Sequence, residues 1–365
     1  MVKSDDLLRL AYAGMHPDRR RLLVATHGGV AGVLRAIRDG RVEVPEQARR
    51  AVGVGADDRR TELEALGLEV VLKGDTGFPD HLAELPDAPD LLFVRGSMAT
   101  DRGVAVVGSR KATSYGIGLG RGYGAALASA GWPVISGLAR GVDGAAHRGA
   151  LDVCGRGMAV MGCGLDVWYP PEHRSLGERL IDSGGCIVSE YPPGTPPLGW
   201  RFPPRNRIIS GLSAAVVVVE AAQRGGALIT AQRALEQGRD VLAVPGDVDR
   251  PTSEGCNLLI RDGAMPVLGP DDLIEAISLI LGPPEVANGS VPLHDDVVEA
   301  LGPVGRTVDW LATNLGLAVS DLLARLARLE TSGVVVRSGG LVMRRGGSSD
   351  PAVADQTPVA GLNER

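Results

Sequence analysis

The sequence predicts an α/β protein whose centre is an extended, Rossmann-like parallel sheet with helices on both faces. A small helical module precedes it and a winged-helix-like module follows it. The chain has 365 residues, enough for two or three domains. Short apolar runs alternate with helical stretches from residue 104 to residue 244, as in βαβ units. Glycine occurs 51 times, about twice its usual ~7% share, and it suits loops that approach a ligand.

Residues 1–68 are predicted to form a helical module of the helix-hairpin-helix or sterile-alpha-motif (SAM) kind. Apolar residues recur at helical spacing over Asp5–Tyr12, behind a Ser4 cap. Pro17 begins a second helix, and Val30–Ile37 gives a third. Bundles of this size serve as DNA contacts or as neutral adaptors, and the sequence leaves both roles open.

Residues 69–282 are predicted to form the sheet domain. Its first part, 69–103, is a connector with short strands at Val70–Leu72 and Leu91–Val94. Buried strands are predicted at Val104–Val107, Pro133–Ile135, Met158–Met161, Cys186–Val188, Ala215–Val219 and Val241–Val244. Helices are predicted at Tyr115–Ala130, Gly144–Leu151, Glu172–Asp182, Ala227–Gln237 and Cys256–Arg261. Uniformly apolar strands indicate that both faces are covered, and ligands of such sheets lie at the carboxyl ends of the strands.

Beyond a linker at 283–290, residues 291–345 are predicted to form the winged-helix-like module, and 346–365 a disordered tail. The expected elements are helices at Asp295–Leu301, Thr307–Leu315 and Ser320–Glu330, then strands at Val334–Arg337 and Leu341–Arg344. In a winged helix the third helix enters the major groove. The basic residues of that helix and of the wing are Arg325, Arg328, Arg337, Arg344 and Arg345. Binding to duplex DNA and contact with a protein both remain open for this module.

The bulk composition predicts a cytoplasmic protein with no membrane segment, metal or cofactor. No basic-then-apolar signal pattern begins the chain, and no apolar run reaches the ~18–20 residues that span a bilayer. The four cysteines form neither a CxxC nor a Cys/His metal spacing, so we expect small buried thiols. A net charge of −6 does not exclude a nucleic-acid partner, because binding requires only a local basic patch.

Candidate binding residues gather in loops that follow the predicted strands. Glycine lets backbone approach an anion, arginine holds a phosphate with two parallel bonds, and a following helix offers free N–H groups. The candidates are Gly108, Ser109, Arg110, Ser136, Gly137, Arg140, Gly141, Arg205, Asn206, Arg207, Gly225, Gly226 and Ala227. Phe202 adds an aromatic ring that could stack on a base. Because the loops meet at one edge of the sheet, we expect a single groove.

Simpler interpretations exist for these loops. Gly108–Arg110 could be a tight turn with a surface arginine, and Arg205 or Arg207 could pair with a carboxylate such as Glu190 or Glu220. The GxGxxG spacing of dinucleotide sites is absent. No carboxylate pair, metal set or Ser/His/Asp spacing stands out, and we therefore predict that the protein is not an enzyme.

Five segments resemble, in order, the DNA-processing protein A family (DprA, also called Smf). They read VAVVGSR, ISGLARGVDGAAH, RFPPRNRIISGLS, GGALITAQRALEQGRDVLAVPG and GCNLLIRDGA, and cover most of 104–268. The resemblance implies a single-stranded-DNA-binding recombination mediator that forms a homodimer and is not known as an enzyme. It implies protection of incoming single strands and help in loading RecA during natural transformation, displacing or bypassing the single-strand-binding protein.

By position, the resemblance assigns the phosphate grip to Gly108–Arg110 and Arg205–Arg207, with Gly225 and Gly226 in the same pocket. Ala227 departs from the family pattern, because many members have serine there. A hydroxyl contact is thus in doubt at this position, whereas a backbone N–H contact would survive.

Two other functions remain open. One is a nucleotide phosphoribohydrolase of the related lysine-decarboxylase-like (LOG) family, whose Pro-Gly-Gly-x-Gly-Thr-x-x-Glu motif is loosely similar to Arg224–Thr230 with Glu236. The last two positions of that turn differ, and the glutamate is displaced. The other is a DNA-binding regulator that acts through the C-terminal module alone.

Overall fold

The computed structural model describes residues 2–282 and, further on, 296–301, 305–319, 335–338 and 341–344, together with Leu322, Leu323, Arg325, Leu326 and Leu329. The predicted linker 283–290 and the predicted disordered tail 346–365 lie outside the described residues. Internal contacts divide the chain into two compact units, Met1–Ala287 and Asn288–Arg365. Each unit is described by itself.

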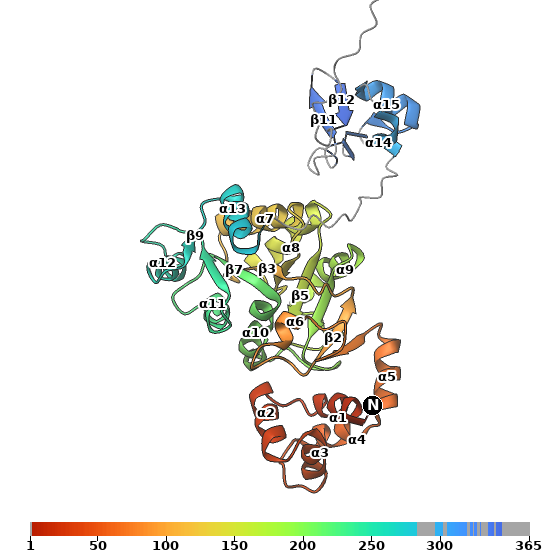
Figure 1. Cartoon of the computed structure of the whole chain (residues 1–365), viewed down its shortest axis with the longest axis vertical. Coiled ribbons are helices and arrows are strands. Elements are labelled where there is room, and N and C mark those ends of the chain that lie inside the picture. The colour runs from red at the N-terminus through yellow and green to blue at the C-terminus, as the bar shows by residue number, and fades with distance from the viewer. Residues whose placement is uncertain are drawn as a thin grey trace, which may run out of the picture. The chain divides into compact units, whose positions relative to one another are not determined.

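The centre of the first unit is a mixed sheet with a long parallel part (Figure 1). In the described part of the chain its strands are β1 (Glu69–Leu72), β2 (Leu91–Gly96), β3 (Gly103–Gly108), β4 (Val134–Ser136), β5 (Gly157–Met161), β6 (Cys186–Ser189), β7 (Ser213–Val219), β8 (Asp240–Ala243) and β9 (Met265–Pro266). Their order is β1-β2-β6-β5-β4-β3-β7-β8-β9. Within this order, all neighbours in the series β6-β5-β4-β3-β7-β8-β9 pair in parallel, which confirms the predicted fold class. The connector strands β1 and β2 extend the same sheet in antiparallel pairing.

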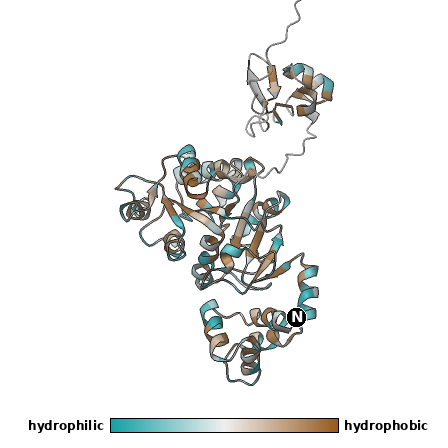
Figure 2. Cartoon of the chain, in the orientation of Figure 1, coloured by the Kyte–Doolittle hydropathy of each residue, from teal (hydrophilic) through white to brown (hydrophobic). Residues whose placement is uncertain are grey.

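Helices cover both faces of the sheet, as its uniformly apolar strands predict. Their bounds are α6 (Asp80–Ala83), α7 (Ser114–Ser129), α8 (Val142–Asp152), α9 (Arg174–Asp182), α10 (Phe202–Leu212), α11 (Gly226–Glu236), α12 (Glu254–Arg261) and α13 (Pro270–Leu281). One core joins α6, α10, α11 and α12 to one face. The other face packs against α7, α8 and α13 and, further along, α9. Figure 2 shows the strands of the sheet in brown and pale colours, between helices in which hydrophilic and hydrophobic colours are mixed.

The chain reverses its direction of travel across the sheet at β3. From β3 it steps through β4 and β5 to β6, and it then returns to the other side of β3 to form β7, β8 and β9. The register pairs Val107 with Val218 and Gly108 with Val219. Loops that leave β3 and β7 therefore diverge, and a crevice opens where open parallel sheets bind ligands.

The N-terminal module contains α1 (Val2–Ala11), α2 (Pro17–Thr26), α3 (Val30–Arg38), α4 (Glu46–Gly53) and α5 (Ala56–Ala65). The three predicted helices are present. The sequence pattern does not predict the other two, because each is polar and buries a single side chain, Val52 or Leu63. The module has its own core and also packs on the sheet domain, where the ring of Tyr12 meets that of Phe93 edge-on at 6.4 Å.

The second unit has the winged-helix arrangement that the sequence predicts. Its described elements are α14 (Asp296–Leu301), β10 (Arg306–Thr307), α15 (Val308–Leu315), β11 (Val335–Ser338) and β12 (Leu341–Arg344). The three strands are ordered β10-β12-β11. The described residues within the predicted helix Ser320–Glu330 are helical, and Leu322, Leu326 and Leu329 enter the core of this unit. Arg328 and Arg345 lie outside the described residues.

Cysteine placement corrects one expectation. Cys163, Cys186 and Cys256 are buried, but Cys154 is exposed, because it lies in the turn after α8 with a left-handed φ of 55°. Within the described residues, no helix combines the length and the apolar character needed to cross a membrane.

Glycines in α7 allow α7 and α8 to approach closely. Gly120 and Gly124 lie four residues apart on the buried side of α7. A Cβ at Gly124 would stand 2.1 Å from the carbonyl oxygen of Ala146 in α8, far inside contact distance. In contrast, no atom lies within 4 Å of a Cβ built at Gly118. The alternating glycines of this helix thus divide into a packing set and a solvent-facing set.

We predict opposite outcomes for alanine at two of these glycines. Gly124→Ala should lower the free energy of unfolding by about 2 kcal/mol, because backbone must move to admit the methyl group. Gly118→Ala should raise it by up to about 1 kcal/mol through helix propensity alone. Urea unfolding followed by circular dichroism measures both. Equal effects of the two substitutions would contradict this account of the α7–α8 contact.

Candidate functional site

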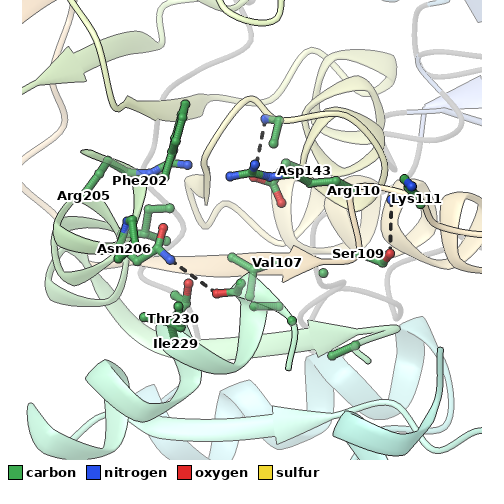
Figure 3. Close-up of a pocket in the computed structure, with 18 of the residues that line it drawn as sticks. Val107, Ser109, Arg110, Lys111, Asp143, Phe202, Arg205, Asn206, Ile229 and Thr230 are labelled. Atoms are coloured by element: carbon green, nitrogen blue, oxygen red, sulfur yellow. Dashed lines mark hydrogen bonds between the residues drawn. The ribbon is translucent and has the colours of Figure 1, made fainter. Parts of the chain in front are cut away.

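A cavity of about 580 Å³ opens at the carboxyl ends of β3 and β7. Figure 3 shows side chains of α10 on one side of it, the residues that follow β3 on the other, and Ile229 and Thr230 of α11 below. Its lining includes Gly108, Ser109, Arg110, Arg205, Asn206, Gly225, Gly226 and Ala227 from the predicted set. The structure thus brings these loops together at the topological switch point, where the sequence predicts a groove.

The loop after β3 is fixed by Glu220, the residue that follows β7. Its backbone oxygen accepts from the N–H of Ser109 at 2.7 Å. Its carboxylate accepts from the backbone N–H of Thr113 at 2.8 Å and from the Thr113 hydroxyl at 2.5 Å. The Thr113 hydroxyl oxygen in turn accepts from the N–H of Gly116. The N-terminus of α7 is therefore capped by Thr113, which is itself bonded to the Glu220 carboxylate. This corrects the expectation that the N–H groups of this helix are free to hold a phosphate.

The N-terminus of α11 faces the cavity without a side-chain cap. Its N-cap residue is Gly225, which has no side chain to accept a hydrogen bond. Gly226 and Ala227, the first residues of the helix, line the cavity. Asn206 of α10 donates to the carbonyl oxygen of Gly226 at 3.3 Å and ties the two helices together. Helix N-termini of this kind attract anions through their N–H groups and dipole.

Arg110 and Lys111 supply exposed positive charge at the cavity. Both are exposed and both line it. Within the part of the chain that the structure describes, neither forms an ion pair with a carboxylate. The guanidinium of Arg110 lies 4.9 Å from the ring centroid of Phe202, and the ring of Phe202 lies 5.5 Å from that of Tyr169. A cation thus stands beside an aromatic pair.

Arg205 is a fixed part of the cavity wall. It is 3% exposed and donates to the carbonyl oxygens of Gly137, at 2.9 Å, and of Val160. Burial lowers the pKa of Arg205 to about 10, although the nearby Asp143 carboxylate acts in the opposite direction. Burial also raises the pKa of Asp143, and Arg205 partly offsets this rise. Asp143 accepts from the backbone N–H groups of Gly137 and Ala139, so it serves the loop rather than the open cavity.

Arg207 does not reach the cavity, contrary to expectation. It is 4% exposed, and its Nη2 lies 2.7 Å from Oε2 of Glu190. The reason is helical geometry: Arg205 and Arg207 are two positions apart, or about 200° around the axis of α10. One side chain faces the cavity and the other faces the interior.

Four further predicted residues lie around the cavity but do not line it. Ser136 is buried and donates to the carbonyl oxygen of Val106. Gly137 lies behind Arg205, and a Cβ there would stand 2.4 Å from Nη1 of that arginine. Gly141 has a φ of 75° and packs on the backbone of Ser109 and Arg110. Arg140 points to solvent and pairs with Glu172. Backbone placement, rather than ligand contact, accounts for the glycines.

Phe202, the ring expected to stack on a base, also lines the cavity. Other polar or aromatic lining residues are not among the predicted contacts, namely Lys111, Asp143, Tyr169 and Thr230. Lys111 directly follows Arg110, and Thr230 lies one helical turn after Ala227 on the same face, so local spacing could have indicated both. Tyr169 comes from the segment after β5, and no local pattern places it beside Phe202.

The arrangement suits an anionic, aromatic ligand. Three cationic side chains and one carboxylate line the cavity, together with apolar side chains, two aromatic rings and an amide. Glu236, the residue loosely similar to the phosphoribohydrolase glutamate, is outside the lining and pairs with Arg233 near the end of α11. Among the described residues, no group of three His, Cys, Asp or Glu side chains could hold a metal ion.

Comparison with known proteins gives two family matches. Residues 69–278 match the family described as DNA recombination-mediator protein A, and residues 282–340 match the DprA winged helix domain. Protein Smf of Escherichia coli (strain K12) is 42% identical over 281 residues, which cover 73% of this chain and 75% of that protein. DNA processing protein DprA of Streptococcus pneumoniae (strain ATCC BAA-255 / R6) is 43% identical over 202 residues, which cover 55% of this chain and 71% of that protein.

Two solved structures are also similar. The X-ray structure of DNA processing protein A from Streptococcus pneumoniae superposes with a TM-score of 0.60 at 35% identity, covering 73% of this chain and 95% of that one. A structure of DNA processing protein A from Helicobacter pylori, described for its single-stranded DNA binding mode, superposes with a TM-score of 0.51 at 26% identity. It covers 57% of this chain and 95% of that one.

Glu220→Gln tests how the loop after β3 is held. We predict a loss of about 2 kcal/mol in the free energy of unfolding, because hydrogen bonds to a charged acceptor are replaced by weaker ones. Glu236→Gln is the control: its ion pair is exposed, and we expect a change below about 1 kcal/mol. Urea unfolding measures both, and hydrogen exchange should rise in residues 109–116 of the first variant. Unchanged exchange there would contradict the role given to Glu220.

Proposed function

The chain belongs to the DNA recombination-mediator protein A family, and from that premise we propose that it binds single-stranded DNA and acts as a recombination mediator. In this proposal it protects incoming single strands and helps to load RecA during DNA uptake, acting on the single-strand-binding protein only indirectly. The grip is non-enzymatic. The observation that carries the proposal is the exposed charge of Arg110 and Lys111 beside the rings of Phe202 and Tyr169.

The chemistry of the cavity favours a single strand over a duplex. Exposed cations at Arg110 and Lys111 attract any phosphate backbone. The rings of Phe202 and Tyr169 and the apolar side chains of the lining can contact the face of a base only where that base is unstacked and unpaired, as it is in a single strand. The uncapped N-terminus of α11 provides a further place for a phosphate.

A homodimer is part of the proposal. β9 is an edge strand of the sheet, with β8 as its paired neighbour. Met265 in this strand is 43% exposed, and Leu268, just after it, is 77% exposed. Exposed apolar side chains favour contact with another chain, which supports self-association at this end of the sheet domain.

Substitution of the two exposed cations tests the DNA grip. Combining Arg110→Ala with Lys111→Ala should weaken binding of a fluorescent oligothymidylate by at least about tenfold. The slope of log affinity against log salt should fall by about one for each phosphate that these side chains no longer neutralise. Arg121→Ala is the matched control, because Arg121 is exposed on α7 and already paired with Asp152. If the double variant binds with wild-type affinity and salt slope, this cavity is not the DNA site.

Mediator activity needs a separate measurement. On single strands coated with single-strand-binding protein, the wild-type chain should shorten the lag before RecA becomes active as a DNA-dependent ATPase. The Arg110→Ala, Lys111→Ala variant should lose this effect, since it lacks the grip on the strand. Arg121→Ala should keep the effect. A chain that binds single strands tightly but leaves the lag unchanged would contradict the mediator role and retain only the binding role.

A further inference from the structure

The N-terminal module is joined to the sheet domain by a buried cluster of charges. Glu190 follows β6 and is 2% exposed. Its Oε1 lies 2.6 Å from Nη2 of Arg20, which belongs to α2 of the N-terminal module. Its Oε2 lies 2.7 Å from Nη2 of Arg207, which belongs to α10. One carboxylate therefore bridges two helices from different parts of the unit.

The surroundings of the cluster keep it charged. Burial alone would raise the pKa of Glu190, but the guanidinium groups of Arg207 and Arg20 outweigh burial and hold that pKa below its ordinary value. Asp90 lies 3.4 Å from Arg20, and Asp87 lies 3.9 Å from Arg207. Removing one member of a buried ion pair leaves its partner uncompensated, so the position of each guanidinium depends on Glu190.

Arg207 depends on its contact with Glu190. In the described part of the chain, Nε and Nη1 of Arg207 are buried without a hydrogen-bond partner. Its hydrogen bond to Glu190 is thus the directional contact that fixes the guanidinium. Arg205 and Asn206, which immediately precede Arg207 on α10, line the cavity. Fixing Arg207 fixes the rotation of the helix that carries them.

A second contact from the same module reaches the start of α10. The ring of His16, the N-cap residue of α2, stacks on Trp200 with centroids 5.6 Å apart and planes at 29°. Trp200 lies in the 3-10 turn Gly199–Arg201 that leads into α10. Its neighbour Gly199 lines the cavity. The α2 segment thus contacts the turn that precedes α10 directly, through His16, and the buried side of α10 indirectly, through Glu190.

We propose that Arg20 is a positioning residue for the nucleic-acid cavity: through Glu190 and Arg207 it sets the rotation of α10. The N-terminal module is then part of the binding site, although none of its residues lines the cavity. The inference rests on the proposed single-strand binding at this cavity.

Neighbouring arginines on α2 provide a matched test in the full chain. Arg20→Met should weaken oligothymidylate binding at least about fivefold, the lower range of coupling between separate sites. Arg20→Lys keeps the charge and should restore most of the affinity. Arg19→Met should bind as wild type, because Arg19 is exposed and donates to the backbone of Glu43 within its own module. Hydrogen exchange should rise in residues 202–212 of Arg20→Met but not in 226–236.

The outcomes separate this inference from the proposed function. If folded Arg20→Met binds as wild type, or if its exchange rises in 1–68 alone, Arg20 does not position α10. If Arg20→Met does not fold, Arg20→Gln replaces it, and wild-type binding together with unchanged exchange in residues 202–212 would overturn the inference. If the Arg110→Ala, Lys111→Ala variant binds as wild type, the proposed function fails whatever Arg20 does.

Discussion

The parallel pairing of β3 with β7 is the constraint on which the site depends. It places the loop after β3 beside Glu220, whose backbone and carboxylate hold that loop at Ser109 and Thr113. Because Glu220 adopts a φ of 49°, its carboxylate turns back to the start of α7 instead of continuing the strand. The N-terminus of α7 is thereby capped by side chains of the protein itself. The uncapped start of α11, on the other side of β7, is left to face an anion.

The arginines near the cavity have two different roles: some are buried and stabilise the structure, and others are exposed and supply surface charge. Arg205 and Arg207 are buried among carbonyl oxygens and carboxylates, where an uncompensated charge would be strongly destabilising. Arg110 and Lys111 remain exposed and unpaired within the described part of the chain. A chain of net charge −6 can thus present a local cationic surface, because binding requires only a few cations that no nearby acid neutralises. This distinction, and not the number of arginines in the loops, decides which of them a ligand can meet.

Much of the fold follows from the sequence, because the strands buried on both faces appear as continuous apolar runs and the loops between them are rich in glycine. The candidate site follows only in part. Arg205 and Arg207 form one group by their closeness in sequence, yet a helix that begins at Phe202 sends them to opposite sides. Arg140 pairs with Glu172, and Arg207 pairs with Glu190. Both pairs form only in the folded chain, so the local sequence pattern does not predict them. Tyr169 comes from a segment that is distant in sequence from the other lining residues, so its place in the cavity could be seen only in the folded structure.

Ala227 shows why a missing side chain need not remove a contact. The family pattern often has a serine here, and its absence puts a hydroxyl contact in doubt. In the structure, Ala227 is in the first turn of α11, where the backbone N–H groups and the helix dipole, rather than side chains, attract an anion. Thr230 follows three positions later on the same face and also lines the cavity. We therefore expect a site built on a helix terminus to tolerate alanine at this position, and a site built on Arg110 to lose affinity when the guanidinium is removed.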